Sequence, residues 1–344
     1  MSYWLAGPVC WFNLLAAMGR QGSQLEVSVV VPSHERVTRL RWLLNALEEQ
    51  TLPRDRWELV VVHDSTDGTE ELVETHPLAA AGVLRRSRLE PGTGSASRQR
   101  NEGWRAAAAP LIAFADDDVR PEPTWLERLL EAAKANPGAI VQGATKPDPY
   151  EAEIMKWAPR ARSIEEPDPP GPHAQACNIL YPRAALEAVG GFDESIRTAG
   201  EDLDLAARVR ARGAGYVGAP DALAYHAVDT FSLPGLVRFN KRWETLPLVF
   251  KRHPELREQL EYGVFWKRRH AFLPAAVAGV ALHRREPLLA LLAVPYVLHA
   301  LPHRGTHPAG RVRAAAELCG RAVVDASEMW TMVKGSVRHR TLML

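Results

Sequence analysis

Short apolar runs alternate with amphipathic segments along most of the chain. The apolar runs are short and mostly rich in β-branched residues, which is typical of buried strands. They are residues 27–31, 57–62, 82–84, 111–115 and 139–141. Segments with the apolar spacing of helices lie between and behind them, at 37–47, 95–108 and 124–135. This order predicts an α/β fold with a mostly parallel, Rossmann-like sheet and helices on both faces.

The second half of the chain departs from this alternation. Residues 146–172 include a run of prolines with acidic residues, and we expect an irregular loop that serves as a lid or a binding loop. A further helix is predicted from Asp202 to Arg212, closed by Gly213. After about Thr230 the pattern is helical and basic, which predicts a helical C-terminal region.

Charge and cysteine content narrow the class of protein. From Gly235 onward, 18 Lys and Arg stand against 8 Asp and Glu, whereas the whole chain carries only +1. The basic C-terminal region suits contact with an anionic surface, and the acidic remainder of the chain suits a bound cation. A solvated basic face is an equally compatible explanation. Cys10, Cys177 and Cys319 have no CxxC spacing, so we expect a reducing compartment.

Carboxylates follow the predicted strands, where a parallel sheet presents its binding site. Asp64 follows one strand, residues 116–118 are three consecutive aspartates after another, and Glu201-Asp202 opens a helix. Three adjacent carboxylates repel one another, and a divalent cation with phosphate oxygens would offset this. The structural alternatives are a helix cap for residues 116–118, an Asx-turn for Asp64 and first-turn helix charge for Asp202.

Five motifs in order resemble family 2 glycosyltransferases of the GT-A fold. Residues 29–35 (VVVPSHE) resemble the family's opening strand and turn, and residues 61–69 (VVHDSTDGT) resemble its "VVDDGSTDGT", one residue shorter here. Residues 98–103 (RQRNEG) are similar to "ARNxG", and residues 114–118 (FADDD) to "FLDxD". GGFDE at 190–194, followed by EDLDL at 201–205, completes the likeness, which covers residues 26–226.

The resemblance implies a nucleotide-sugar site. Pro32 and Glu35 would line the nucleoside pocket, and Asp64 would bind the base. Arg98 or Arg100 would hold the nucleotide, since a guanidinium suits a diphosphate, with surface solubility as the alternative.

The same resemblance assigns the donor sugar and the cation. Asp117 is expected beside the ribose or the donor sugar, Asn178 near the donor sugar, and Asp116 among the residues that bind the nucleotide-sugar. Asp118 would bind Mg²⁺ or Mn²⁺, which neutralises the leaving diphosphate. His226 is a second candidate metal ligand, with a purely structural role as the alternative.

For the acceptor side, the resemblance implies that Asp202 is the general base of a single inverting displacement, with Glu201 beside it holding geometry or contacting the acceptor. Residues 239–243 (FNKRW) resemble the "QxxRW" of processive members, but Phe239 replaces the glutamine, which puts polymer synthesis in doubt. Arg242 and Trp243 are expected to flank the diphosphate or the acceptor, or else form one face of an amphipathic helix.

Rival functions fit less well. A sugar-phosphate nucleotidyltransferase needs a Gly-rich basic loop after the first strand, and residues 31–35 have none. An aspartyl phosphatase needs DxDxT, and residues 116–120 lack the threonine. A catalytically weak, membrane-tethered sugar-nucleotide-binding protein stays open as an alternative, although Asp118 and Asp202 together argue against it. No nucleic-acid partner is expected.

Two uncharged stretches, 271–282 and 287–301, follow cationic residues in the C-terminal region. Each is shorter than the ~20 residues of a simple span, so we expect a hairpin or interfacial pair at the cytoplasmic face of a membrane, or else buried core helices. The acceptor would then be a glycan or a lipid-linked sugar of the cell envelope. The expected organisation is an extension at 1–25, a catalytic domain at 26–230 with nucleotide (26–120) and acceptor (121–230) halves, and a helical region at 231–344.

Overall fold

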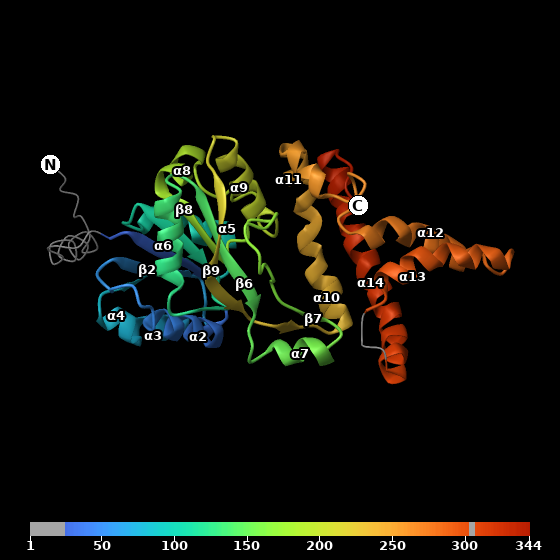
Figure 1. Cartoon of the computed structure of the whole chain (residues 1–344), viewed down its shortest axis with the longest axis horizontal. Helices are drawn as coiled ribbons and strands as arrows, with labels where there is room; N and C mark the ends of the chain where they lie inside the picture. The colour runs from blue at the N-terminus through green and yellow to red at the C-terminus, as the bar shows by residue number, and fades with distance from the viewer. Residues whose placement is uncertain (1–24, 303–306) are drawn as a thin grey trace, which may run out of the picture.

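A computed structural model describes residues 25–302 and 307–344, so nearly all of the expected extension at 1–25 lies outside the described residues (Figure 1). The core is an eight-stranded sheet in the order β3-β2-β1-β4-β8-β6-β9-β5. Its strands are β1 Val27–Ser33, β2 Trp57–His63, β3 Leu84–Arg88, β4 Leu111–Ala115, β5 Val119–Pro121, β6 Ile140–Pro147, β8 Asn178–Pro182 and β9 Tyr216–His226.

The sheet is parallel in its first half and mixed in its second. Strands β3, β2, β1 and β4 run parallel, as the βα alternation predicts. Strand β8 inserts antiparallel between β4 and β6, and β5 pairs antiparallel with β9. The mixed half arises because β8 follows the long 146–172 segment, which lets the chain re-enter the sheet in the opposite direction.

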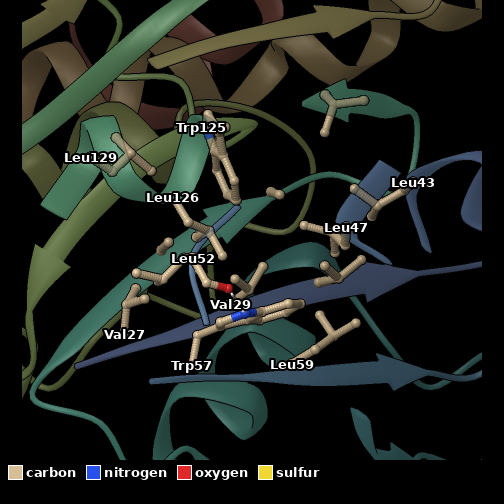
Figure 2. Packing of buried hydrophobic residues seen from close by; sticks show 14 of the residues in the cluster. Val27, Val29, Leu43, Leu47, Leu52, Trp57, Leu59, Trp125, Leu126 and Leu129 are labelled. Atoms are coloured by element: carbon tan, nitrogen blue, oxygen red, sulfur yellow. Dashed lines mark hydrogen bonds between the residues drawn. The ribbon is translucent and has the colours of Figure 1, made fainter. Parts of the chain in front are cut away.

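Helices cover both faces of the sheet because alternate strand residues point to opposite sides. On one face, Val27 and Val29 pack with α2 (Val37–Glu48), α3 (Thr69–Thr75), α4 (Pro77–Ala80) and α6 (Trp125–Ala135). Figure 2 shows Trp57 among these side chains, and its Nε1 donates to the Leu52 carbonyl at 3.1 Å. On the other face, Val30 packs with α5 (Ala96–Ala106), α8 (Arg183–Val189) and α9 (Glu201–Arg210).

The segment expected to be an irregular loop is partly regular. Its first two residues extend β6, and it contains helix α7 (Ala152–Trp157) and strand β7 (Ala161–Arg162). Strand β7 pairs with β10 (Asp229–Thr230), which follows β9. Proline composition concealed these short elements, of which β7 is stabilised by its pairing with the distant β10. Residues 163–165 of this segment line the cavity described below.

The C-terminal region is helical, as predicted, and is organised around the long helix α14 (Pro308–His339). The other elements are α10 Leu233–Phe239, η1 Asn240–Thr245, α11 Leu246–Arg252, η2 Pro254–Gln259, α12 Arg268–Leu282, η3 Pro287–Ala293 and α13 Val294–Ala300. Met332 of α14 and Phe250 of α11 share a core with Leu203 of α9, so this region is anchored on a helix that packs against the sheet.

Helices α12 and α13 form an arm that extends away from the sheet on the far side of α14 (Figure 1). The inner side of the arm has a small buried core that includes Leu273, Ala276 and Tyr296. Its outer side exposes large apolar side chains, among them Leu288 at 70% and Leu298 at 72%. None of the helices in residues 25–302 and 307–344 is both long and apolar enough for a membrane crossing.

Candidate active site

A cavity of about 770 Å³ opens at the carboxyl ends of β1, β2 and β4, where the sheet meets the C-terminal region. Most of the residues proposed from the sequence line it. They are Pro32, Asp64, Arg100, Asp116, Asp117, Asp118, Glu201, Asp202, His226, Arg242 and Trp243. Motifs from distant parts of the chain are thus assembled around one space, which the edge of the sheet makes possible.

The three consecutive aspartates after β4 point to three different partners. Asp116 Oδ1 accepts from Arg100 Nη2 at 2.7 Å, and Asp117 Oδ2 accepts from Ser33 Oγ at 2.8 Å. Arg36 Nη1 lies 2.5 Å from Asp118 Oδ2 and 3.4 Å from Asp117 Oδ1. Burial, together with the charge of Asp118, raises the pKa of Asp117 to about 7. Burial also opposes ionisation of Asp116, but Arg100 outweighs it and lowers the pKa of that carboxyl.

Asp118 and His226 present donor atoms that suit a divalent cation. The Asp118 Oδ1 atom is buried without a hydrogen-bond partner, and His226 Nε2 lies 3.5 Å from it. His226 Nδ1 contacts the Ala227 carbonyl at 2.8 Å, which requires the proton on Nδ1 and leaves the Nε2 lone pair facing Asp118 in the neutral ring. Two acceptors that face each other need a proton or a cation between them, and oxygen with imidazole nitrogen suits Mn²⁺.

Glu201 and Asp202 begin helix α9, directly after Gly200. Gly200 has φ +94°, and a Cβ there would lie 3.0 Å from Val249 Cγ2, so only glycine fits this turn comfortably. Asp202 Oδ2 accepts from the Ala176 amide at 3.0 Å, and Oδ1 lies 3.3 Å from Arg100 Nη1. Burial and the neighbouring Glu201 carboxylate raise the pKa of Asp202 to about 7, a value suited to a general base near neutral pH.

Arg100 is the buried cation that joins these acidic groups. Its guanidinium contacts Asp116 of the β4 end, as well as Glu201 at 3.2 Å and Asp202 at 3.3 Å on α9. Burial alone would lower its pKa, but these carboxylates outweigh that effect and raise it, so Arg100 stays charged. The residue therefore fixes the relative positions of the two acidic groups as well as lining the cavity.

Asp64 lies deep at the end of β2, where two contacts to Oδ1 and one to Oδ2 leave Oδ2 able to accept a further hydrogen bond. Its oxygens accept from the Gly94 amide at 2.9 Å and from Gln99 Nε2 at 3.0 Å, and His34 Nδ1 lies 2.7 Å away. These contacts hold one orientation of the carboxylate at the cavity wall. This orientation is compatible with the base-binding role expected for Asp64.

Three of the proposed residues do not line the cavity. Glu35 Oε1 accepts from the Thr66 amide at 2.7 Å, and exposed Arg98 donates to the Thr93 carbonyl at 3.2 Å. Asn178 is buried inside the sheet, where its Oδ1 accepts from Trp125 Nε1 at 2.8 Å. Its Nδ2 donates to the Ala144 and Ala222 carbonyls at 2.8 and 3.0 Å. In this structure the Asn178 amide therefore holds strands and helix α6 together rather than facing the cavity.

The C-terminal region contributes an aromatic and cationic wall that sequence reasoning largely missed. Arg242 stacks on Phe239 at 4.8 Å and on Trp243 at 5.4 Å, and Trp243 lies 6.4 Å from the Trp266 ring. Other cavity-lining residues not foreseen are Ser33, His34, Arg36, Gln99, Arg162, His173, Phe231 and Trp266. For Ser33, His34 and Arg36 a signal existed, because they lie within or next to the first motif. The wall residues lacked one because their proximity depends on how the C-terminal helices pack.

A second group of potential ligands lies outside the cavity. His270 of α12 and Asp325 and Glu328 of α14 are buried with ligand atoms within 4.8 Å of one another. Lys267 binds Glu328, and Arg269 Nε lies 2.7 Å from Asp325 Oδ2. Two cations already neutralise the two carboxylates, so this group forms an ion-pair network that joins α12 to α14.

Comparison with known sequences gives a consistent result. The model of "Glycosyl transferase family 2" matches residues 28–190. Glycosyltransferase AglE of Haloferax volcanii is 26% identical over 220 residues, 60% of this chain and 68% of that protein. Validoxylamine A glucosyltransferase of Streptomyces hygroscopicus is 30% identical over 226 residues, 54% of this chain. The aligned region spans only about half of that relative's length, 52%.

Solved structures share the fold. The mannosyltransferase PcManGT of Pyrobaculum calidifontis, solved with GDP-Man and Mn²⁺, aligns with TM-score 0.55 at 19% identity, covering 96% of this chain and 94% of that one. Residues 1–349 of S. aureus TarS align with TM-score 0.53 at 18% identity, covering 92% of both chains. At this identity the likeness establishes the GT-A fold.

Proposed function

Residues 28–190 of this chain belong to glycosyl transferase family 2, and from this premise we propose an inverting, cation-assisted transfer of a sugar from a nucleoside diphosphate to an acceptor hydroxyl. The observation that carries the proposal is that Asp118 and Asp202, from separate motifs, line one cavity. One carboxylate is positioned for a cation beside the leaving group, and the other for the proton of the attacking hydroxyl.

Asp202 acts as the general base in this proposal. Its two oxygens are oriented by Ala176 and Arg100, and each keeps a second lone pair that can accept the acceptor proton. With a pKa of about 7, Asp202 is substantially ionised at neutral pH and basic enough to assist proton removal. The hydroxyl attacks the anomeric carbon opposite the leaving diphosphate, and a single displacement inverts that carbon.

Asp118 and His226 would hold the divalent cation, Mn²⁺ or Mg²⁺, with Asp117 beside them. When bound, such a cation neutralises charge that develops on the leaving diphosphate. Asp64 and Pro32 would contact the nucleoside, with the base at the β2 end and the diphosphate near residues 116–118. PcManGT, which has a similar fold, was solved with Mn²⁺ and GDP-Man, and this supports a divalent cation as part of the proposal.

The acceptor enters from the side of the C-terminal wall, where Arg242 and Trp243 face the cavity. Trp243 offers an aromatic surface of the kind on which sugar rings pack. We further propose a glycan or lipid-linked sugar acceptor of the cell envelope. The exposed apolar side of the α12–α13 arm supports a peripheral position at an inner membrane face, since Arg284 and Arg285 lie next to its apolar side chains.

Two experiments test these proposals. Release of nucleoside diphosphate from a panel of nucleotide-sugars measures the reaction, because slow hydrolysis occurs without the true acceptor. Release with one donor, abolished by Asp118→Ala, supports the transferase, whereas pyrophosphate release from a nucleoside triphosphate and sugar phosphate would favour a nucleotidyltransferase. Flotation with anionic vesicles tests the proposed membrane contact of the arm. Wild-type protein should float with the vesicles, and the double variant Leu288→Glu with Leu298→Glu should not. Wild-type protein that stays in the aqueous fraction would contradict the membrane contact.

A further inference from the structure

Arg36 holds the carboxylates that a cation would need. Its Nη1 lies 2.5 Å from Asp118 Oδ2 and 3.4 Å from Asp117 Oδ1. Asp118 is thus shared between this guanidinium on Oδ2 and His226, 3.5 Å from Oδ1. Of the three aspartates, Asp116 has Arg100 as its buried counter-ion, and Arg36 is the corresponding cation for the other two.

The local backbone directs Arg36 toward these carboxylates. The preceding Glu35 has φ +53°, a left-handed conformation that a non-glycine residue adopts only when its surroundings hold it. The Thr66 amide binds the Glu35 carboxylate, and Asp67 Oδ2 accepts from the Val37 amide at 2.7 Å. Contacts from the loop after β2 therefore fix the residues on both sides of Arg36.

The Arg36 side chain, in contrast to the backbone around it, is free to move away from the two carboxylates. The side chain is 46% exposed, and Arg36 is the residue just before helix α2, where its side chain makes no capping hydrogen bond. A guanidinium is not deprotonated in proteins, so the group remains a cation. A guanidinium and a divalent cation on the same carboxylate repel each other, so one must move when the other binds.

We propose that Arg36 competes with the divalent cation for Asp118, and that the donor's diphosphate relieves the competition by giving the displaced guanidinium a new partner. This inference rests on the proposed cation at Asp118. A forked guanidinium binds phosphate oxygens bidentately, and the diphosphate lies beside the cation in the proposed mode. The cation alone therefore binds weakly, and cation and nucleotide each raise the affinity for the other by the same factor.

Calorimetric titration of the full chain with MnCl₂, alone and with saturating UDP, GDP, CDP or dTDP, tests the competition without an activity measurement. Wild type should bind Mn²⁺ more tightly with its cognate nucleotide by roughly 5–150-fold, the usual range for coupled sites. Arg36→Gln should bind Mn²⁺ alone more tightly than wild type, and its nucleotide-dependent gain in Mn²⁺ affinity should be smaller than that of wild type. Arg36→Lys keeps a cation and should retain weak binding of Mn²⁺ alone.

Arg39→Gln is the matched control. Arg39 lies one turn further along α2, pairs with Glu151 at 2.6 Å and stacks on Trp42, so its removal should leave Mn²⁺ binding as in wild type. If wild type binds Mn²⁺ and Arg36→Gln binds it no more tightly, the competition is wrong while the cation site stands. If neither protein binds Mn²⁺ with or without nucleotide, the cation site of the proposed function fails as well.

Discussion

Arg100 Nη1 lies 3.3 Å from Asp202 Oδ1, which joins helix α5 to the first turn of α9 at the buried edge of the cavity. The same guanidinium holds Asp116 at 2.7 Å, so it connects the acidic group after β4 with the proposed base. Because the Ala176 amide binds the other Asp202 oxygen, the orientation of this carboxylate is set by the fold. Such preorganisation is what a positioned base requires.

Asp202→Asn should lower turnover by ~10²–10⁴ while leaving the donor affinity nearly unchanged. The amide keeps the shape and can still accept a hydrogen bond from Ala176, but it cannot take a proton. Steady-state transfer rates and calorimetric binding of the nucleoside diphosphate provide the two measurements. A loss smaller than about threefold would reduce Asp202 to a helix-end charge and direct attention to Glu201, Asp193 or Asp204.

The pH profile of transfer should follow the ionisation of Asp202. Its pKa is raised to about 7 by burial and by Glu201, so the base is protonated and inactive below that pH. The kcat/KM should therefore rise about tenfold per pH unit up to pH of about 7 and level off above it. The residual activity of Asp202→Asn should lack this limb. A limb that persists in the variant would assign it to another group, such as Asp117, whose pKa is also about 7.

Asn178→Ala should destabilise the protein without weakening the donor affinity of the folded fraction. The substitution leaves Trp125 Nε1 and two strand carbonyls buried without their partner. Each such group costs about 1–3 kcal/mol of unfolding free energy. Urea unfolding measures this cost, and exposed Asn136→Ala serves as the control. Intact stability combined with lost donor binding would instead support the sugar-binding role expected from the resemblance.

The strand and helix periodicity was sufficient to predict the sheet, its first four parallel strands and the helices on both faces. The antiparallel insertion of β8 could not be predicted, because it depends on the path that residues 146–172 take before the chain returns to the sheet. Likewise, the elements α7 and β7 are too short and too proline-flanked to stand out locally. Strand pairing between distant residues decides such features, and a local pattern contains no information about it.

The candidate site was likewise predictable in part. Asp64, residues 116–118 and Glu201-Asp202 line the cavity because each follows a strand or opens a helix at the same edge of the sheet. Glu35, Arg98 and Asn178 occupy the matching motif positions but face elsewhere, since motif identity does not determine side-chain direction. Arg36 was overlooked although it directly follows Glu35, and only the contact with Asp118 draws attention to it.

Thermal unfolding with UDP, GDP, dTDP and CDP, each with Mn²⁺ or with excess chelator, tests the central claim most directly. A ligand that binds only the folded protein stabilises it by about 2.7 kcal/mol at a hundredfold excess over its Kd. One nucleotide should raise the Tm of wild type with Mn²⁺, and the rise should vanish with chelator or in Asp118→Ala. No rise with any nucleotide, or an equal rise in chelator and in Asp118→Ala, would contradict a cation-assisted nucleotide-sugar site at residues 116–118.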